Sequence, residues 1–262
     1  MRPRPQRFRI PLSWLDPGRE LLAIKVSADS AGKVGMVWDY LEKRGLALLG
    51  AALNVGREGA VAFGMVDATG LGLEAAREAA LGVPIEGVSV EVIDAGRGFA
   101  STGGHELEVG SGRAVVASEK TLLGLFRGIR ELMGDDAGAA FLYYAGAMSG
   151  REWGRLLRDM GYDAGAALRV NFRALESQGY ATRVEVLEGK DRFRIEVYDL
   201  VECDLLSSYA AGKGGMRTSH WFRGAVAGFL SAALGGEWEV EEVECVNEGS
   251  DKCAFEARRR PG

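Results

Sequence analysis

Two of the three cysteines in this chain lie near its C-terminus, close to a carboxylate. Cys245 and Cys253 are eight positions apart, and Glu242 precedes the first of them by three residues. His220, one of only two histidines, lies upstream beside Trp221. Thiolate, imidazole and carboxylate are the ligands that zinc prefers in a closed tetrahedral structural site. The pattern predicts such a site at His220, Glu242, Cys245 and Cys253.

The backbone must satisfy one condition for these side chains to meet. Cys245 and Cys253 end two predicted strands that face each other across a turn at Gly249, so their sulfur atoms can converge. Glu242 is an odd number of residues from Cys245, and in a regular strand the two would point to opposite faces. Convergence therefore requires a β-bulge or a bend. The alternative is a pair of reduced cysteines packed as small hydrophobic residues, with His220 at the surface.

The composition restricts the class of protein. The chain has 262 residues, of which 47 % are hydrophobic and 26 % charged, enough for one large or two medium domains with a substantial core. Its net charge of −5 gives no bulk attraction to nucleic acid or to an anionic membrane surface, so neither partner is expected. No apolar run reaches the roughly 18 residues that would cross a bilayer, and no secretory signal pattern is visible. Three cysteines do not make a disulfide framework, and we expect a cytoplasmic protein.

The first part of the chain alternates short apolar strands with helical periodicity. After an N-terminal tail at 1–18, residues 19–95 predict the order β-α-β-β-α-β, the split unit of ferredoxin-like folds. A glycine-rich stretch at 96–110 predicts a linker. The expected elements are strands at 21–27, 46–54, 59–66 and 88–93, and helices at 34–41 and 73–81.

The second part, 111–259, predicts another α/β domain, in which helices precede an antiparallel sheet. Strict alternation at 180–187 and 192–198 indicates a hairpin. Taken together, the two parts predict an α/β (α+β) chain. The helices are expected at 121–132, 137–148, 153–160, 167–178 and 219–234, and the last strand pair at 238–245 and 252–258.

The β-α-β-β-α-β order, with a small turn at 30–32 between the first strand and the first helix, resembles an ACT domain. ACT domains usually pair side by side and bind amino acids or similar effectors near that turn. The resemblance implies that Gly32 marks where the backbone approaches an amino-acid-like effector. The alternative is that Gly32 only permits a φ that the turn requires.

The C-terminal motif carries a second resemblance. Glu-x-x-Cys-x-x-x-Gly-x-x-x-Cys-x-Phe is matched at Glu242, Cys245, Gly249, Cys253 and Phe255, and a Gly-x-x-x-Gly-Phe helix precedes it at 224–229. Residues 112–257 thereby resemble the 4-vinyl-reductase-type domain, also called the hydrocarbon-binding domain. The resemblance implies an antiparallel sheet with helices along it, a buried apolar pocket and a homodimer. It also implies zinc held by the glutamate, the two terminal cysteines and one earlier cysteine.

This chain departs from the motif at the earlier cysteine, whose counterpart falls at 219–221. His220 is a chemically sound replacement there, and Ser219 is not. Cys203, the remaining thiol, follows the predicted hairpin and is kept as a reserve ligand.

Two hypotheses about function follow. The sequence has no nucleophile elbow, P-loop or metalloprotease helix, which favours a non-catalytic sensor that binds an apolar, aromatic or lipid-like molecule. The alternative is an enzyme or accessory factor of tetrapyrrole or aromatic-compound metabolism, which a redox cofactor fingerprint would favour. Aromatic side chains are expected both in the core and around the ligand. The candidate ligand-binding residues are Phe172, Tyr198, Trp221 and Phe229.

Overall fold

The computed structural model describes residues 10–109, 112–189 and 191–260. The chain forms two compact units, and the boundary between them falls between Ala114 and Val115. The first unit is larger than predicted, because its first strand begins at Ser13 and its last long strand ends at Ser101. The described end of the predicted tail and the start of the predicted linker are therefore paired strands. Residues 1–9 of the predicted tail lie outside the described residues.

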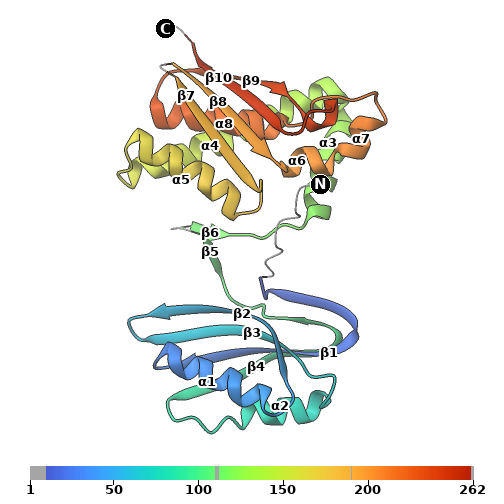
Figure 1. Ribbon diagram of the computed structural model, residues 1–262, viewed down its shortest axis with the longest axis vertical. Helices are drawn as coiled ribbons and strands as arrows, with labels where there is room; N and C mark the ends of the chain where they lie inside the picture. Colours follow the sequence, from blue (N-terminus) through green and yellow to red (C-terminus); the bar gives the residue numbers. More distant parts are fainter. Residues whose placement is uncertain (1–9, 110–111, 190, 261–262) are drawn as a thin grey trace. The chain divides into compact units, whose positions relative to one another are not determined.

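The first unit has the predicted β-α-β-β-α-β order. Its four-stranded sheet is antiparallel, with the strand order β2-β3-β1-β4, and helices α1 and α2 cover one face (Figure 1). A small β5-β6 ladder follows. The bounds are β1 Ser13–Ala28, α1 Ala31–Glu42, β2 Ala47–Gly56, β3 Gly59–Asp67, α2 Leu73–Leu81, β4 Val88–Ser101, β5 Leu107–Val109 and β6 Gly112–Ala114.

The structure rules out the alternative interpretation of Gly32, that its turn requires a special φ. Gly32 lies within the first turn of α1, and Ser30, with an extended φ of −153°, is the residue that precedes the helix. An ideal Cβ on Gly32 would have no described atom within 4 Å, and its φ is not positive. Gly32 therefore supplies no special turn conformation, and an effector near this position remains a prediction.

The second unit has a four-stranded antiparallel sheet with the order β7-β8-β10-β9. The predicted hairpin corresponds to β7 and β8, and the predicted last strand pair to β9 and β10. The bounds are α3 Glu119–Met133, α4 Asp135–Asp159, α5 Ala164–Ser177, β7 Arg183–Gly189, β8 Arg192–Tyr198, α6 Val201–Leu205, α7 Ser207–Ala211, α8 His220–Leu234, β9 Trp238–Glu244, the 3₁₀ turn η1 Val246–Glu248 and β10 Cys253–Arg259.

The two helices predicted at 137–148 and 153–160 are one 25-residue helix, α4. Gly150 does not interrupt it, because this glycine is needed for helix contact: a Cβ at Gly150 would overlap the carbonyl of Ala225 in α8. The same holds in the other direction, since a Cβ at Gly228 would overlap the carbonyl of Ala147. α4 and α8 thus pack backbone against backbone. Glycines that face this contact are Gly146, Gly150, Gly154, Gly224 and Gly228.

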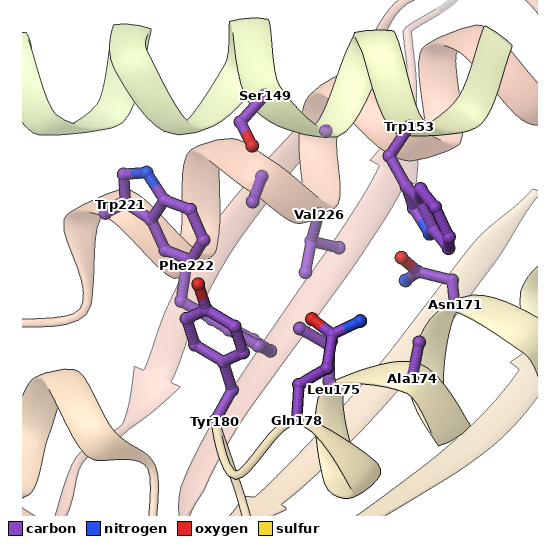
Figure 2. A pocket seen from close by; sticks show the side chains of 12 residues that line it. Ser149, Trp153, Asn171, Ala174, Leu175, Gln178, Tyr180, Trp221, Phe222 and Val226 are labelled. Atoms are coloured by element: carbon purple, nitrogen blue, oxygen red, sulfur yellow. The ribbon is translucent and has the colours of Figure 1, made fainter. Parts of the chain in front are cut away.

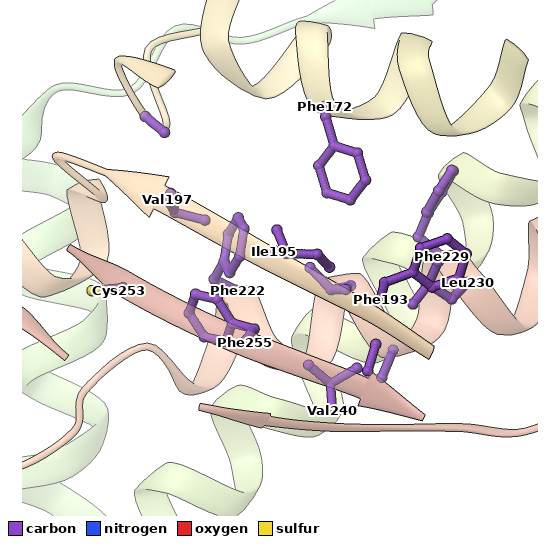
Figure 3. Close-up of a cluster of buried hydrophobic side chains, with 14 of the residues drawn as sticks. Phe172, Phe193, Ile195, Val197, Phe222, Phe229, Leu230, Val240, Cys253 and Phe255 are labelled. Carbon is purple, nitrogen blue, oxygen red and sulfur yellow. The ribbon is translucent and has the colours of Figure 1, made fainter. Parts of the chain in front are cut away.

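The core of the second unit lies between the sheet and the helices α5 and α8 (Figure 3). Phe222 of α8 contacts Phe255 of β10, with ring centroids 5.0 Å apart. The opposite face of the sheet is charged: Arg194 pairs with Glu196, which also accepts a hydrogen bond from Lys252. The period-2 pattern of the strands explains these two faces. None of the helices in the described ranges combines the length and apolar character needed to cross a bilayer.

Candidate functional site

Three thiols and one carboxylate converge at one end of the second sheet. Cys203 comes from α6, Glu242 from β9, Cys245 from the residue after β9, and Cys253 opens β10. All four are buried, and their potential ligand atoms lie within 4.8 Å of one another. We call this group the thiol–carboxylate cluster.

A β-bulge brings Glu242 and Cys245 together, as their odd spacing requires. In the β9–β10 ladder Ala254 pairs with Glu244 but Phe255 pairs with Glu242, so Val243 is the extra residue on β9. An extra residue reverses the facing of the strand beyond it. The bulge thus turns Glu242 to the side on which the thiols lie.

The cluster fits the geometry of a tetrahedral metal site. Zinc–sulfur bonds of about 2.3 Å at tetrahedral angles place two sulfur atoms about 3.8 Å apart. The Sγ of Cys203 lies 3.8 Å from that of Cys245 and 3.4 Å from that of Cys253. The Oε1 of Glu242 is buried and has no hydrogen-bond partner among the described residues. Cys₃Glu is therefore a suitable donor set for zinc.

The electrostatics of the cluster concentrate negative charge on one sulfur. Hydrogen bonds from the thiols of Cys203 and Cys253 lower the pKa of Cys245, and the hydrogen bond with Cys245 raises the pKa of Cys203. Burial raises the pKa of Glu242 to about 8. A buried thiolate at Cys245 needs a compensating charge, which a cation held by the cluster would supply.

The structure groups Cys203, the reserve ligand, with the other three predicted donors in place of His220. Among the described residues the fourth member of the group is Cys203, and His220 is not part of it. His220 begins α8, with its Nδ1 3.4 Å from Nη2 of Arg223. Burial lowers the pKa of His220 to about 4, so its ring is neutral at pH 7. Cys203 reaches the cluster because the chain turns at Asp199, which has a φ of 51°, and then forms the short helix α6.

An aromatic pocket of about 200 Å³ lies between α4, α5 and α8. Trp153 and Asn171 lie on one side of it, and Trp221 and Tyr180 on the other (Figure 2). The rings of Tyr180 and Trp221 stack, with centroids 5.5 Å apart and an interplanar angle of 15°. Burial raises the pKa of Tyr180, so its hydroxyl remains protonated and able to donate a hydrogen bond. The other lining residues are Ser149, Gly150, Ala174, Leu175, Gln178, Phe222, Ala225 and Val226.

Of the predicted ligand-binding residues, Trp221 lines this pocket. Phe172 and Phe229 lie instead in the hydrophobic core. Tyr198 is buried beneath the guanidinium of Arg183, which lies 3.9 Å from its ring centroid. All three are buried as aromatic residues commonly are, but they do not line the pocket.

Glu202, which the sequence did not single out, joins the cluster region to the pocket. Its carboxylate accepts hydrogen bonds from the backbone N–H groups of Trp221 and Phe222, each at 3.0 Å. It thereby caps α8 from a distant helix, and in the described part of the chain the side chain of Ser219 makes no such cap. Burial raises the pKa of Glu202 to about 7. No sequence signal indicates this cap, because the partners are about one helix and one loop apart in the chain.

Comparison with known proteins agrees with this architecture. Residues 196–259 match the model of the V4R domain, which confirms the 4-vinyl-reductase-type part of the predicted resemblance. The match begins in the last residues of β8 and covers α8, β9, β10 and all four cluster residues. An ACT domain is not shown for the first unit. No curated protein sequence matches the chain.

Several solved structures are similar to part of the chain. The phenol-responsive sensory domain of the transcription activator PoxR, bound to phenol, has a TM-score of 0.52 and 19 % identity over 59 % of this chain and 80 % of its own. Trafficking protein particle complex subunit 3 from Naegleria fowleri, covalently bound to palmitic acid, has a TM-score of 0.40 and 15 % identity, over 55 % of this chain and 95 % of its own. A vinyl-4-reductase family protein from Methanocaldococcus jannaschii has a TM-score of 0.32 and 16 % identity, over 57 % of this chain and 100 % of its own. The first of these supports an α+β fold with antiparallel sheets for the second unit.

Proposed function

We propose that the second unit is a non-catalytic receptor for a small aromatic molecule. The observation that carries this proposal is the pocket, which combines four aromatic rings with the amides of Asn171 and Gln178 and the hydroxyl of Tyr180. Such a lining holds an apolar body and orients a polar substituent. The phenol-bound sensory domain of PoxR, which has a similar fold, supports the same class of ligand.

The size of the pocket favours a single-ring compound over a lipid-like one. A cavity of about 150 Å³ is known to hold benzene. The pocket here, at about 200 Å³, therefore suits one ring with one or two small substituents. Tyr180 is kept neutral by burial and serves as a hydrogen-bond donor, which fits binding without proton abstraction.

Phenol is the probe that tests this function. Tyr180→Phe keeps the ring stack with Trp221 and removes only the hydroxyl. A net hydrogen bond contributes about 0.5–1.5 kcal/mol, so phenol affinity measured by calorimetry is expected to fall about 2–10-fold, with toluene affinity unchanged. Trp221→Ala is expected to weaken both ligands by about tenfold or more, because it removes a wall of the pocket.

Tyr144→Ala is the matched control, since Tyr144 is an exposed aromatic residue on α4 outside the pocket. It should leave both affinities unchanged. Mass spectrometry of the incubated mixture should recover phenol unaltered. Consumption of phenol by the protein would show that it is an enzyme of aromatic metabolism and not a receptor. Absence of phenol binding to the wild type would refute the assignment of the pocket.

We also propose that the thiol–carboxylate cluster holds a structural zinc ion. Cys203, Glu242, Cys245 and Cys253 would hold it, and its bound form supplies a closed four-donor cross-link between α6, β9 and β10. Two observations support this assignment: the Sγ of Cys203 lies 3.8 Å and 3.4 Å from those of Cys245 and Cys253, and the Oε1 of Glu242 has no hydrogen-bond partner among the described residues.

We further propose that the first unit is an ACT-like regulatory or dimerising module. Its β-α-β-β-α-β order and its β2-β3-β1-β4 sheet support the resemblance to an ACT domain. Binding of an amino-acid-like effector near Gly32 remains part of this proposal, and the open space around an ideal Cβ at Gly32 is compatible with it. The homodimer remains a prediction: light scattering at micromolar concentration should give twice the mass of one chain, and a monomer would contradict it.

A further inference from the structure

The carboxylate of Glu202 lies between the thiol–carboxylate cluster and the aromatic pocket. Its side chain is 1 % exposed, and both of its oxygen atoms are occupied by backbone N–H groups at the start of α8. On one side its neighbour in the chain is Cys203, a member of the thiol–carboxylate cluster. On the other side, the two residues whose amides it holds, Trp221 and Phe222, line the aromatic pocket.

Two further sets of contacts also connect the cluster to α8. Nδ2 of Asn247 donates to the carbonyl of Cys203 at 3.1 Å and to Oγ1 of Thr218 at 2.8 Å, which ties α6 to the segment leading into α8. The ring of Phe222 packs on Phe255, two residues after Cys253. The pocket wall formed by α8 is therefore attached to the cluster through both α6 and β10.

We propose that Glu202 is a positioning residue that couples metal occupancy of the cluster to the shape of the aromatic pocket. A metal bound at Cys203 fixes α6, which is only five residues long. Glu202 passes that constraint to the first turn of α8 and so holds Trp221 and Phe222 where the ligand needs them. This inference rests on the proposed function of the pocket and of the cluster.

Thermodynamic linkage makes the coupling measurable from both sides. If Zn²⁺ raises the affinity for phenol by a given factor, phenol must raise the affinity for Zn²⁺ by the same factor. Couplings of this kind are typically about 5–150-fold, and we expect about tenfold here. Zn²⁺ alone should also slow hydrogen exchange of the amides of Trp221 and Phe222 by a similar factor, because it stabilises the cap that protects them.

The experiment uses the full chain, stripped of metal and reloaded with Zn²⁺. Phenol affinity is measured by calorimetry with and without Zn²⁺, and exchange of the 219–225 segment is followed by mass spectrometry. Glu202→Gln conserves the volume but replaces one acceptor oxygen by an NH₂ group that cannot accept from an amide. In this variant Zn²⁺ and phenol should each still bind, while the coupling factor and the Zn²⁺-dependent protection fall to near one.

Glu176→Gln is the matched control. The Oε1 of Glu176 also accepts a hydrogen bond from a backbone N–H, that of Val184 at 2.7 Å, but Glu176 is not adjacent in sequence to a member of the cluster. Its coupling factor should equal that of the wild type. The wild-type measurement needs no variant, so poor folding of Glu202→Gln would not protect the proposal from refutation.

Each outcome decides one question. Phenol binding with Zn²⁺-independent affinity and Zn²⁺-independent exchange overturns the coupling and leaves the pocket assignment intact. Zn²⁺-dependent protection without any phenol binding overturns the proposed function and leaves the coupling between cluster and pocket wall. Full coupling in Glu202→Gln overturns the role of Glu202, and failure of the wild type to bind Zn²⁺ overturns the proposal entirely.

Discussion

Cys203→Ser is expected to reduce the zinc content of the purified chain from about one ion to nearly none and to lower its melting temperature by on the order of 10 °C. Serine cannot replace a thiolate ligand, and the remaining donors, Glu242, Cys245 and Cys253, stay buried without a cation. Removing one partner from a buried ionic group costs about 3–5 kcal/mol. A domain of this size loses about 2–4 °C per kcal/mol. Atomic absorption and thermal unfolding followed by circular dichroism provide the measurement.

His220→Ala is the informative companion to this variant. The motif comparison placed the fourth ligand at His220, whereas the structure places Cys203 in the cluster. His220→Ala should therefore retain zinc at the wild-type level. Loss of zinc from His220→Ala together with retention in Cys203→Ser would show that the donor set proposed here is wrong. A wild-type chain that contains no zinc and unfolds identically with and without chelator would contradict the structural metal altogether.

Gly150→Ala is expected to destabilise the second unit by about 1–3 kcal/mol, although alanine is the better helix former. The added methyl group would overlap the Ala225 carbonyl in α8, and because the obstacle is backbone, the two helices must separate. Separation exposes apolar surface along the entire contact between α4 and α8. Urea unfolding at equilibrium should show a lower midpoint.

Gly128→Ala is the control for helix propensity. Gly128 lies in α3, and an ideal Cβ there would have no described atom within 4 Å. This variant should gain up to about 1 kcal/mol from the better helix propensity of alanine. Equal effects of the two substitutions would show that the α4–α8 contact is less close than the structure has it.

Local sequence patterns predicted the elements well where periodicity and turns agreed. The strict alternation of β7 and β8 gave their pairing, and the parity of Glu242 and Cys245 required the bulge that the β9–β10 register contains. The predicted break between 148 and 153 was wrong, because a glycine inside a helix, here Gly150, can have two opposite meanings. It either ends the helix or admits a neighbour, and only the position of α8 distinguishes these.

Long-range placement could not be predicted in the same way. Cys203 is 42 residues from Cys245, and its arrival at the cluster depends on a single left-handed residue, Asp199, and a five-residue helix. The aromatic residues present a related difficulty, because burial in a core and burial around a ligand favour the same side chains. Phe172 was therefore indistinguishable from Trp221 until the space between α5 and α8 was known.

The glycines between α4 and α8 also set the width of the aromatic pocket. Gly150 and Trp153 belong to α4 yet line the same pocket as Phe222 and Val226 of α8, so the distance between the helix axes sets the width of the pocket. Larger residues at these contacts would widen the pocket without altering its aromatic and amide side chains. In proteins with this architecture the width of the pocket can accordingly diverge through the helix spacing alone, while the chemistry of the pocket wall stays the same.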